Sequence, residues 1–101
     1  MAAMTEVQKY TIYGFLLADL QKKSADYAQK KYLEGLIDVA VKEIGREGIE
    51  LDFADMSHLQ TIEMYAAYLY RKRTADNNGM PRMLRFRLNN LLFEQKMESD
   101  S

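Results

Sequence analysis

Apolar residues recur along most of this chain at spacings of three and four, which place them on one face of an α-helix. The strongest such pattern runs from Ser24 to Gly45, and charged residues occupy the opposite face. Ser24 or Asp26 can cap its start, and Gly45 and Gly48 can end it. Its apolar positions are Leu33, Leu36, Ile37, Ala40, Val41 and Ile44. This segment is predicted to be a long amphipathic helix.

A second helical pattern runs from about Asp55 to Ala75. Ser57 with Gln60 matches the spacing of a capping box at its start, and Asp55 is a competing cap. Its apolar face is formed by Leu59, Ile62, Tyr65, Ala66 and Leu69.

A third pattern runs from Met80 to Met97, with Pro81 in a first turn where its missing N–H costs nothing. Its main apolar face is formed by Leu84, Leu88, Leu91 and Leu92. Residues 98–101 are predicted to be a short, frayed polar tail.

The N-terminal segment, from Thr5 to Lys22, is less regular. Thr5 with Gln8 again matches a capping box, and the apolar positions are Tyr13, Leu16, Leu17 and Leu20. The β-prone residues 10–13 and the following glycine work against a helix, so residues 1–25 are the part of the chain that the pattern defines least.

Residues 49–53 alternate strictly between apolar and polar, but the chain offers no obvious partner strand, so they are interpreted as an extended connector. The predicted fold class is all-α. A small bundle of three long helices, joined by an N-terminal helix, forms a single domain over residues 1–101.

The helical segments carry apolar residues outside their main faces. In the last segment this second face comprises Met83, Phe86, Asn90, Phe93 and Met97, at a spacing close to a heptad seam. Weaker versions comprise Ala28, Tyr32, Gly35 and Val39 in the first long helix and Met64, Ala67 and Tyr68 in the second. Either the bundle encloses its helices on more sides than expected, or these faces contact other subunits, where methionine and aromatic residues are enriched.

Charge is balanced overall, with 14 Lys and Arg against 15 Asp and Glu in 101 residues, which argues against a chain that coats nucleic acid. A local basic cluster is formed by Arg71, Lys72, Arg73, Arg82, Arg85 and Arg87. This cluster could contact phosphates, pair with acids of a neighbouring subunit, or simply be solvated. Direct reading of DNA bases is disfavoured, because Met and Phe fill the second face of the last helix.

Catalytic and metal chemistry find little support. The sequence has no cysteine and a single histidine, His58, which is expected to pack or cap rather than bind metal. Asp52 and Asp55 are interpreted as connector and cap residues, and no phosphate loop or catalytic triad pattern is present. We therefore expect a protein that is not an enzyme and has no cofactor. Neither a signal peptide nor a membrane span is recognised.

Five short stretches resemble the small head–tail connector proteins of tailed phages and prophages, also called head completion or adaptor proteins. The stretches are residues 32–40, 48–51, 64–71, 79–84 and 88–92, within a likeness that covers roughly residues 24–97. The Met-Pro at 80–81 and the Leu-Asn-Asn-Leu-Leu at 88–92 carry it best. The N-terminal part departs from the family, because residues 18–25 read Ala-Asp-Leu-Gln-Lys-Lys-Ser-Ala.

The resemblance implies a structural role in the virion, at the head–tail interface, for a protein made in the bacterial host cytoplasm. Subunits of this family form a homo-oligomeric ring beneath the portal, extend the DNA channel and dock a further connector or stopper protein. Isolated subunits can be monomeric. The resemblance places the segment from Phe93 to Ser101 near the portal protein, and leaves the basic cluster facing either channel DNA or acidic neighbours. No membrane partner is implied.

Two other hypotheses stay open. The basic cluster from Arg71 to Arg87 could belong to a small helical nucleic-acid-binding regulator. Alternatively, the second face of the last helix could serve a helical dimerisation module with neither nucleic acid nor phage partner.

Overall fold

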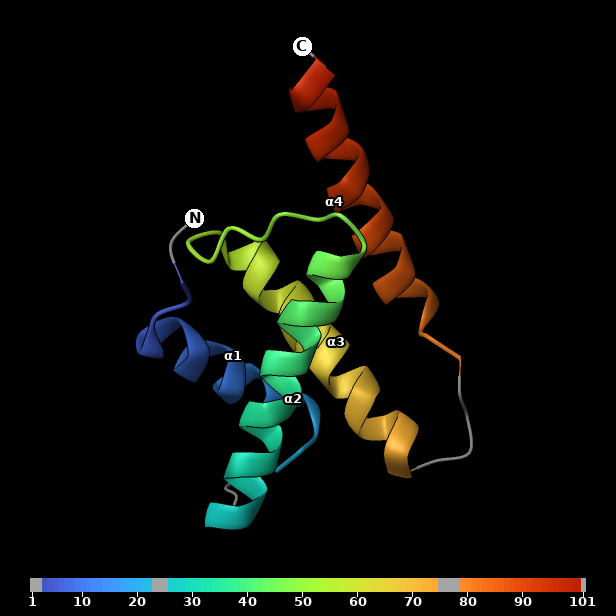
Figure 1. Cartoon of the computed structure of the whole chain (residues 1–101). Helices are drawn as coiled ribbons and strands as arrows, with labels where there is room; N and C mark the ends of the chain where they lie inside the picture. The colour runs from blue at the N-terminus through green and yellow to red at the C-terminus, as the bar shows by residue number, and fades with distance from the viewer. Residues whose placement is uncertain (1–2, 23–25, 75–78, 101) are drawn as a thin grey trace.

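The computed structural model describes residues 3–22, 26–74 and 79–100, and within these ranges the chain forms α-helices and no strand. The helices are α1 (Glu6–Asp19), α2 (Tyr27–Arg46), α3 (Met56–Thr74) and α4 (Arg82–Asp100) (Figure 1). The prediction of an all-α fold with an N-terminal helix and three longer ones is confirmed. No helix in the described ranges has the length and apolar character needed to cross a bilayer.

The N-termini of α1 and α2 are capped as the sequence indicates. The Thr5 hydroxyl accepts a hydrogen bond from the Gln8 N–H at 3.1 Å, and the Gln8 side chain accepts one from the Thr5 N–H at 2.9 Å, so the predicted capping box is present. At α2 the cap is Asp26, whose carboxylate accepts from the Gln29 N–H at 2.8 Å. The alternative cap, Ser24, lies outside the described residues.

Helix α3 begins at Met56, earlier than a capping box at Ser57 would place its start. The Asp55 carboxylate accepts a hydrogen bond from the Ser57 N–H at 2.9 Å, so Ser57 is already inside the first turn. The Ser57–Gln60 box is therefore wrong, and the competing cap, Asp55, is the one that forms. A carboxylate is favoured there because it also complements the positive end of the helix dipole.

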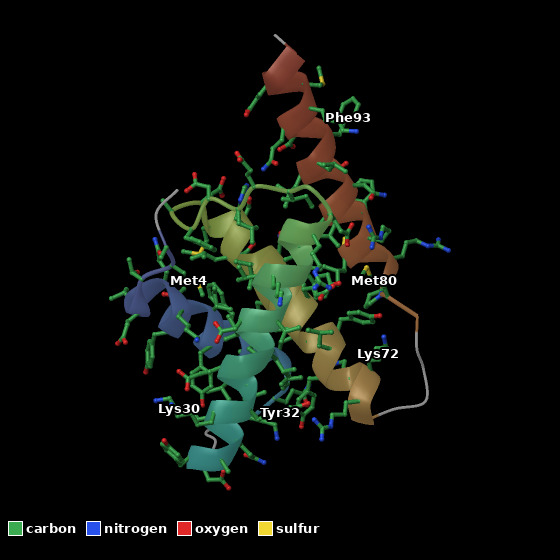
Figure 2. The ribbon with its side chains drawn as sticks, in the orientation of Figure 1. Met4, Lys30, Tyr32, Lys72, Met80 and Phe93 are labelled. Atoms are coloured by element: carbon green, nitrogen blue, oxygen red, sulfur yellow. The ribbon has the colours of Figure 1, made fainter. Side chains whose placement is uncertain are left out.

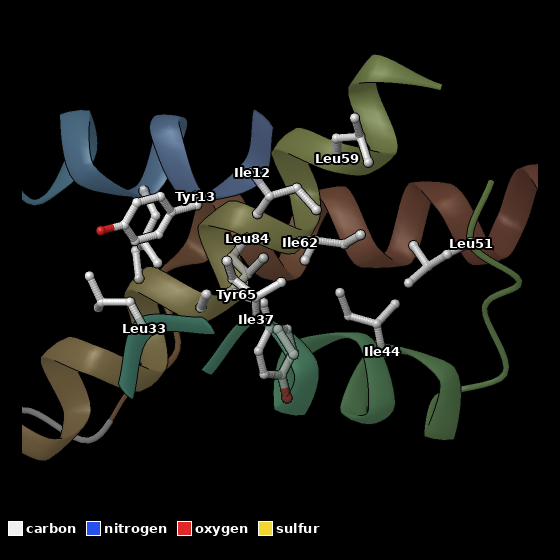
Figure 3. Packing of buried hydrophobic residues seen from close by; sticks show 14 of the residues in the cluster. Ile12, Tyr13, Leu33, Ile37, Ile44, Leu51, Leu59, Ile62, Tyr65 and Leu84 are labelled. Carbon is white, nitrogen blue, oxygen red and sulfur yellow. The ribbon is translucent and has the colours of Figure 1, made fainter. Parts of the chain in front are cut away.

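The core is built around α3, which contacts each of the other helices. Figure 3 shows Ile37 of α2, Ile62 of α3 and Leu84 of α4 meeting in its centre. Because α3 is covered on several sides, Ala67, predicted to lie on an outer face, is 1% exposed instead. On α1 the fully buried Ile12 is a core residue that the predicted apolar face omits, because it falls within the β-prone stretch.

Two helices end at a residue in the left-handed region. Gly48 follows α2 with a φ of 91° and confirms one of the two predicted stop residues, whereas Gly45 lies inside the helix. Gln21 follows α1 with a φ of 59°, and the next residue's N–H bonds to the Leu17 carbonyl at 2.8 Å. This is a Schellman closure in which glutamine takes the place usually filled by glycine.

Residues 49–53 form a connector that is neither helix nor strand, as predicted, with a turn starting at Phe53, and side chains of other elements bond to its backbone. The Gln95 amide of α4 accepts from the Glu50 N–H at 2.8 Å and donates to the Glu50 carbonyl at 2.6 Å. His58 Nδ1 accepts from the Asp52 N–H at 2.9 Å. The Gln95 side chain thus hydrogen-bonds to the connector backbone as a neighbouring strand would, and it links the C-terminal half of α4 to the bundle.

Helix α4 differs from the prediction at both ends. Pro81 lies just before the helix, and its carbonyl accepts from the Arg85 N–H at 3.1 Å. The helix continues to Asp100, so residues 98–100 are helical rather than a frayed tail, and residue 101 lies outside the described ranges. In Figure 1 the C-terminal half of α4 projects past the other helices.

The left-handed glycine gives a direct test of the fold. Gly48→Ala is expected to lower the free energy of unfolding by about 1–2 kcal/mol, because an L side chain is strained at positive φ. The matched control is Gly35→Ala inside α2, where an added Cβ has no neighbour within 4 Å. That change is expected to raise stability by about 0.5–1 kcal/mol. Urea unfolding measures both, and a neutral Gly48→Ala would contradict the assigned helix end.

Candidate interaction surface

The outer face of α4 is apolar and exposed along its whole length. We call the set Met83, Phe86, Asn90, Phe93 and Met97 the α4 seam. Its apolar members are 64%, 61%, 64% and 59% exposed, in chain order, and Asn90 is exposed as well. Figure 2 shows Phe93 on the part of α4 that extends beyond the bundle. The predicted second face of this helix therefore lies in solvent.

The α4 seam lies opposite the face that α4 gives to the core. At about 100° per residue, the seam positions centre about 160° away from Leu84 and Leu88. Leu84 and Leu88 are fully buried, and Leu91 and Leu92 beside them are partly buried. Helix α4 thus has two apolar faces, of which its own chain covers one.

The weaker second faces on α2 and α3 are mostly used inside the chain. Val39 is 44% exposed, but Tyr32, Met64 and Tyr68 are partly buried against the core. The Tyr32 ring lies 6.3 Å from that of Tyr70, centroid to centroid. The Tyr68 ring meets that of Tyr65 edge-on at 5.8 Å. Of the predicted interface residues, the exposed apolar ones therefore concentrate on α4.

The predicted basic cluster is distributed over several contacts within the chain. Arg71 pairs with the Asp19 carboxylate at 2.8 Å, at the end of α1. Arg85 pairs with Glu47 at 2.7 Å, at the end of α2. These two arginines tie helix ends together, so their charge is offset by acids of the same chain.

The other basic residues lie against aromatic rings or backbone oxygens. Lys72 lies 5.8 Å from the centre of the Tyr68 ring, and Arg73 lies 5.2 Å from that of Tyr32. The Arg87 guanidinium approaches the Ser57 carbonyl and the Thr61 hydroxyl, both at 3.4 Å. Arg82 is exposed at the start of α4. Asp76, the acid expected between the two halves of the cluster, lies outside the described residues.

A carboxyl pair, the buried Glu63 and the more exposed Asp19, joins α3 to α1 beside Arg71. Burial raises the pKa of Glu63 from 4.5 to about 8, and its hydrogen bond and charge interaction with Asp19 act in the same direction. The hydrogen bond from Glu63 lowers the pKa of Asp19, and Arg71 lowers it further. Glu63 is therefore protonated at neutral pH and donates to an ionised Asp19. Sequence periodicity gave no signal for this pair, because Glu63 lies between core positions of α3.

A hollow with a volume of about 770 Å³ lies between the connector, the start of α1 and the far half of α4. Acidic residues line it: Glu50, Asp52, Asp55, Glu94 and Glu98. His58 also borders it, but this side chain is buried and occupied with the connector backbone, in keeping with a packing role. Within the described ranges, no group of three His, Cys, Asp or Glu residues is placed to hold a metal ion.

Comparison of the chain with known protein families, with curated proteins and with solved structures finds no match. The candidate surface is therefore defined by this chain's own geometry: an exposed apolar seam on one helix, and basic residues that largely face partners within the chain.

The carboxyl pair predicts an unusual dependence of stability on pH. Because folding raises the Glu63 pKa, its protonated form adds stability that is complete below about pH 4.5 and is lost as pH rises through about 8. The melting temperature is expected to fall between about pH 5 and pH 8, the interval bounded by the unfolded and folded pKa values. Glu63→Gln should flatten this fall, since the amide stays neutral and can still donate to Asp19.

The control for removing one carboxyl is Glu94→Gln, an exposed position on α4. Thermal unfolding followed by circular dichroism measures all three proteins. A Glu63→Gln protein that loses stability between the two pH values as steeply as the wild type would contradict a protonated, buried Glu63.

Proposed function

We propose that this protein is a structural subunit of a larger assembly, of the kind formed by tailed-phage head–tail connector proteins. In this proposal, copies of the chain form a ring beneath the portal vertex, extend the DNA channel and dock the next connector or stopper protein. The observation that supports it most is the exposed α4 seam, which a solitary bundle has no reason to carry.

Leaving the α4 seam exposed to water is energetically unfavourable. Burying one large apolar side chain is worth about 1.5–3 kcal/mol relative to leaving it exposed, and the seam exposes Met83, Phe86, Phe93 and Met97 in a row. Such a contiguous exposed face marks an interaction site. Methionine and phenylalanine suit a contact between proteins, and methionine adapts to surfaces of imperfect shape.

Ring formation requires two different surfaces on each subunit, because a ring contact is heterologous. The α4 seam is one such surface. We assign the second to Val39 together with the exposed edges of Tyr32, Met64 and Tyr68. The projecting end of α4, from Phe93 onward, is the part we assign to the portal protein. Arg82 remains exposed and could meet channel DNA or an acidic neighbour.

The alternative is a small regulator that binds nucleic acid through the basic cluster. The contacts of Arg71 and Arg85 weigh against it, because a side chain paired with an acid of its own chain must give up that contact to bind a phosphate. The assembly role is therefore better supported than the nucleic-acid-binding role.

The assembly role predicts binding to the portal protein encoded in the same phage or prophage genome. Phe93→Asp is expected to weaken this association at least about tenfold, because it places a charge in the apolar contact. The matched control is Val7→Asp on α1, which alters an exposed apolar residue away from the seam and should bind as the wild type does. Sedimentation of the mixture, or co-purification, measures the effect. Failure of the wild type to associate with the portal at any salt concentration would refute the proposal.

Titration with duplex DNA separates the two functions. We expect weak binding without sequence preference and with a shallow dependence on salt, because few of the basic residues are available. The test variant is Arg73→Ser combined with Arg82→Ser. Tight binding by the wild type, with a steep salt dependence that this variant abolishes, would favour the regulator instead.

A further inference from the structure

The α4 seam follows a heptad register without interruption. With Met83 as position a, Phe86 is d, Asn90 is the next a, Phe93 the next d and Met97 the third a. The seam therefore has the pattern of a two-helix coiled coil, with a single asparagine at its central a position. In coiled coils, one buried asparagine of this kind fixes register and partner number.

Charged residues flank the two edges of the seam unequally. Arg82, Asn89 and Lys96 occupy the g positions on one edge, whereas Arg87 and Glu94 occupy the e positions on the other. The g edge is thus purely basic or neutral, and the e edge carries one charge of each sign. This arrangement discriminates between the ways in which two copies can pair.

A parallel pair is disfavoured by charge. Parallel helices bring each g residue near the following e residue of the other helix, so Arg82 would meet Arg87 of the second copy on both edges. An antiparallel pair brings e residues together and g residues together. In the register that pairs Asn90 with Phe93 of the second copy and Phe86 with Met97 of the second copy, Arg87 lies near Glu94 of the second copy on one edge, twice by symmetry.

We propose that the α4 seam pairs with the α4 seam of a second copy of this chain in that antiparallel register. The two Asn90 residues then lie on either side of the two-fold axis, offset by three residues or about 4.5 Å along the helices, within reach of an amide–amide hydrogen bond. Each antiparallel register leaves part of the seam unpaired: Met83 in the proposed one, and Met97 in the register one heptad closer to the helix N-termini. Charge decides between these two, because the latter would place Arg87 beside Arg87 of the second copy. A shift of one heptad the other way would place Glu94 beside Glu94 of the second copy and leave Phe86 unpaired as well.

The fold leaves room for this dimer. Leu84 and Leu88 hold each α4 to its own bundle on the side opposite the seam, so the two bundles lie on outer sides of the helix pair. The C-terminal half of α4 projects past its bundle (Figure 1) and can lie along the N-terminal half of the other α4. This dimer goes beyond the proposed ring, because a two-fold contact is closed and cannot propagate around one. It would cover the seam until a portal or neighbouring subunit replaces the second copy.

Cysteine cross-linking tests the register, since the chain has no cysteine of its own. Phe86→Cys and Met97→Cys change exposed side chains and should leave the fold intact. Oxidation of a mixture of the two variants should give a disulfide between them, whereas Met97→Cys alone should give little dimer. A disulfide dimer of Met97→Cys alone, with none in the mixture, would show a parallel pair and overturn the proposal.

Charge reversal tests the pairing without cross-links. Arg87→Glu and Glu94→Arg should each weaken the dimer about tenfold in sedimentation equilibrium, and the double variant should restore it. Thermal unfolding of each variant checks that the loss is not one of folding, since Arg87 also approaches α3 within its own chain. A wild type that stays monomeric at every accessible concentration would overturn the dimer while leaving portal binding as a separate question. If the dimer forms but the protein does not bind the portal protein, only the proposed ring is refuted.

Discussion

The architecture follows from the position of α3. This helix contacts α1, α2 and α4, so its apolar side and its less apolar side are both covered. Even Ala67 and Thr61, which lie outside its main apolar face, are buried. With α3 enclosed, α4 can reach the core along one side only, through Leu84 and Leu88. Its other side has no helix of the same chain to cover it, and the seam from Met83 to Met97 is left in water. The surface offered to partners is thus a consequence of how the core is filled.

Electrostatic contacts hold the helix ends in this arrangement and pair two of the six residues of the basic cluster with acids of the same chain. Arg71 secures the end of α1 and Arg85 the end of α2, while Gln95 secures the connector by pairing with its backbone. Exposed ion pairs contribute little each, about 0–1 kcal/mol, so their main effect is to fix geometry rather than to stabilise the fold. Glu63 differs, because burial keeps it protonated and makes stability depend on pH.

Sequence patterns predicted the helices, the connector, the cap at Thr5 and, as one of two candidates, the cap at Asp26, because these features depend on neighbours a few residues apart. They also predicted the second face of α4, whose exposure the structure confirms. They missed features that depend on distant neighbours: Gln95 reaching the connector, Glu63 meeting Asp19, and α3 being enclosed far enough to bury Ala67. The basic residues were grouped by their nearness in sequence, whereas their partners lie on α1, α2 and α3. The resemblance to head–tail connectors stays a proposal that rests on sequence patterns and on the seam.

The central claim is that another protein chain buries the α4 seam. The rate of methionine oxidation reports the solvent exposure of individual seam residues. Met83 and Met97 lie on the seam, and Met56 is a control of similar exposure at the start of α3. Mild peroxide treatment of the dilute protein, read by mass spectrometry, should oxidise all three at comparable rates. At high protein concentration Met97 should become protected by the second copy, and with saturating portal protein Met83 and Met97 should both become protected, while Met56 stays reactive. Equal reactivity of all three under both of these conditions would contradict the account.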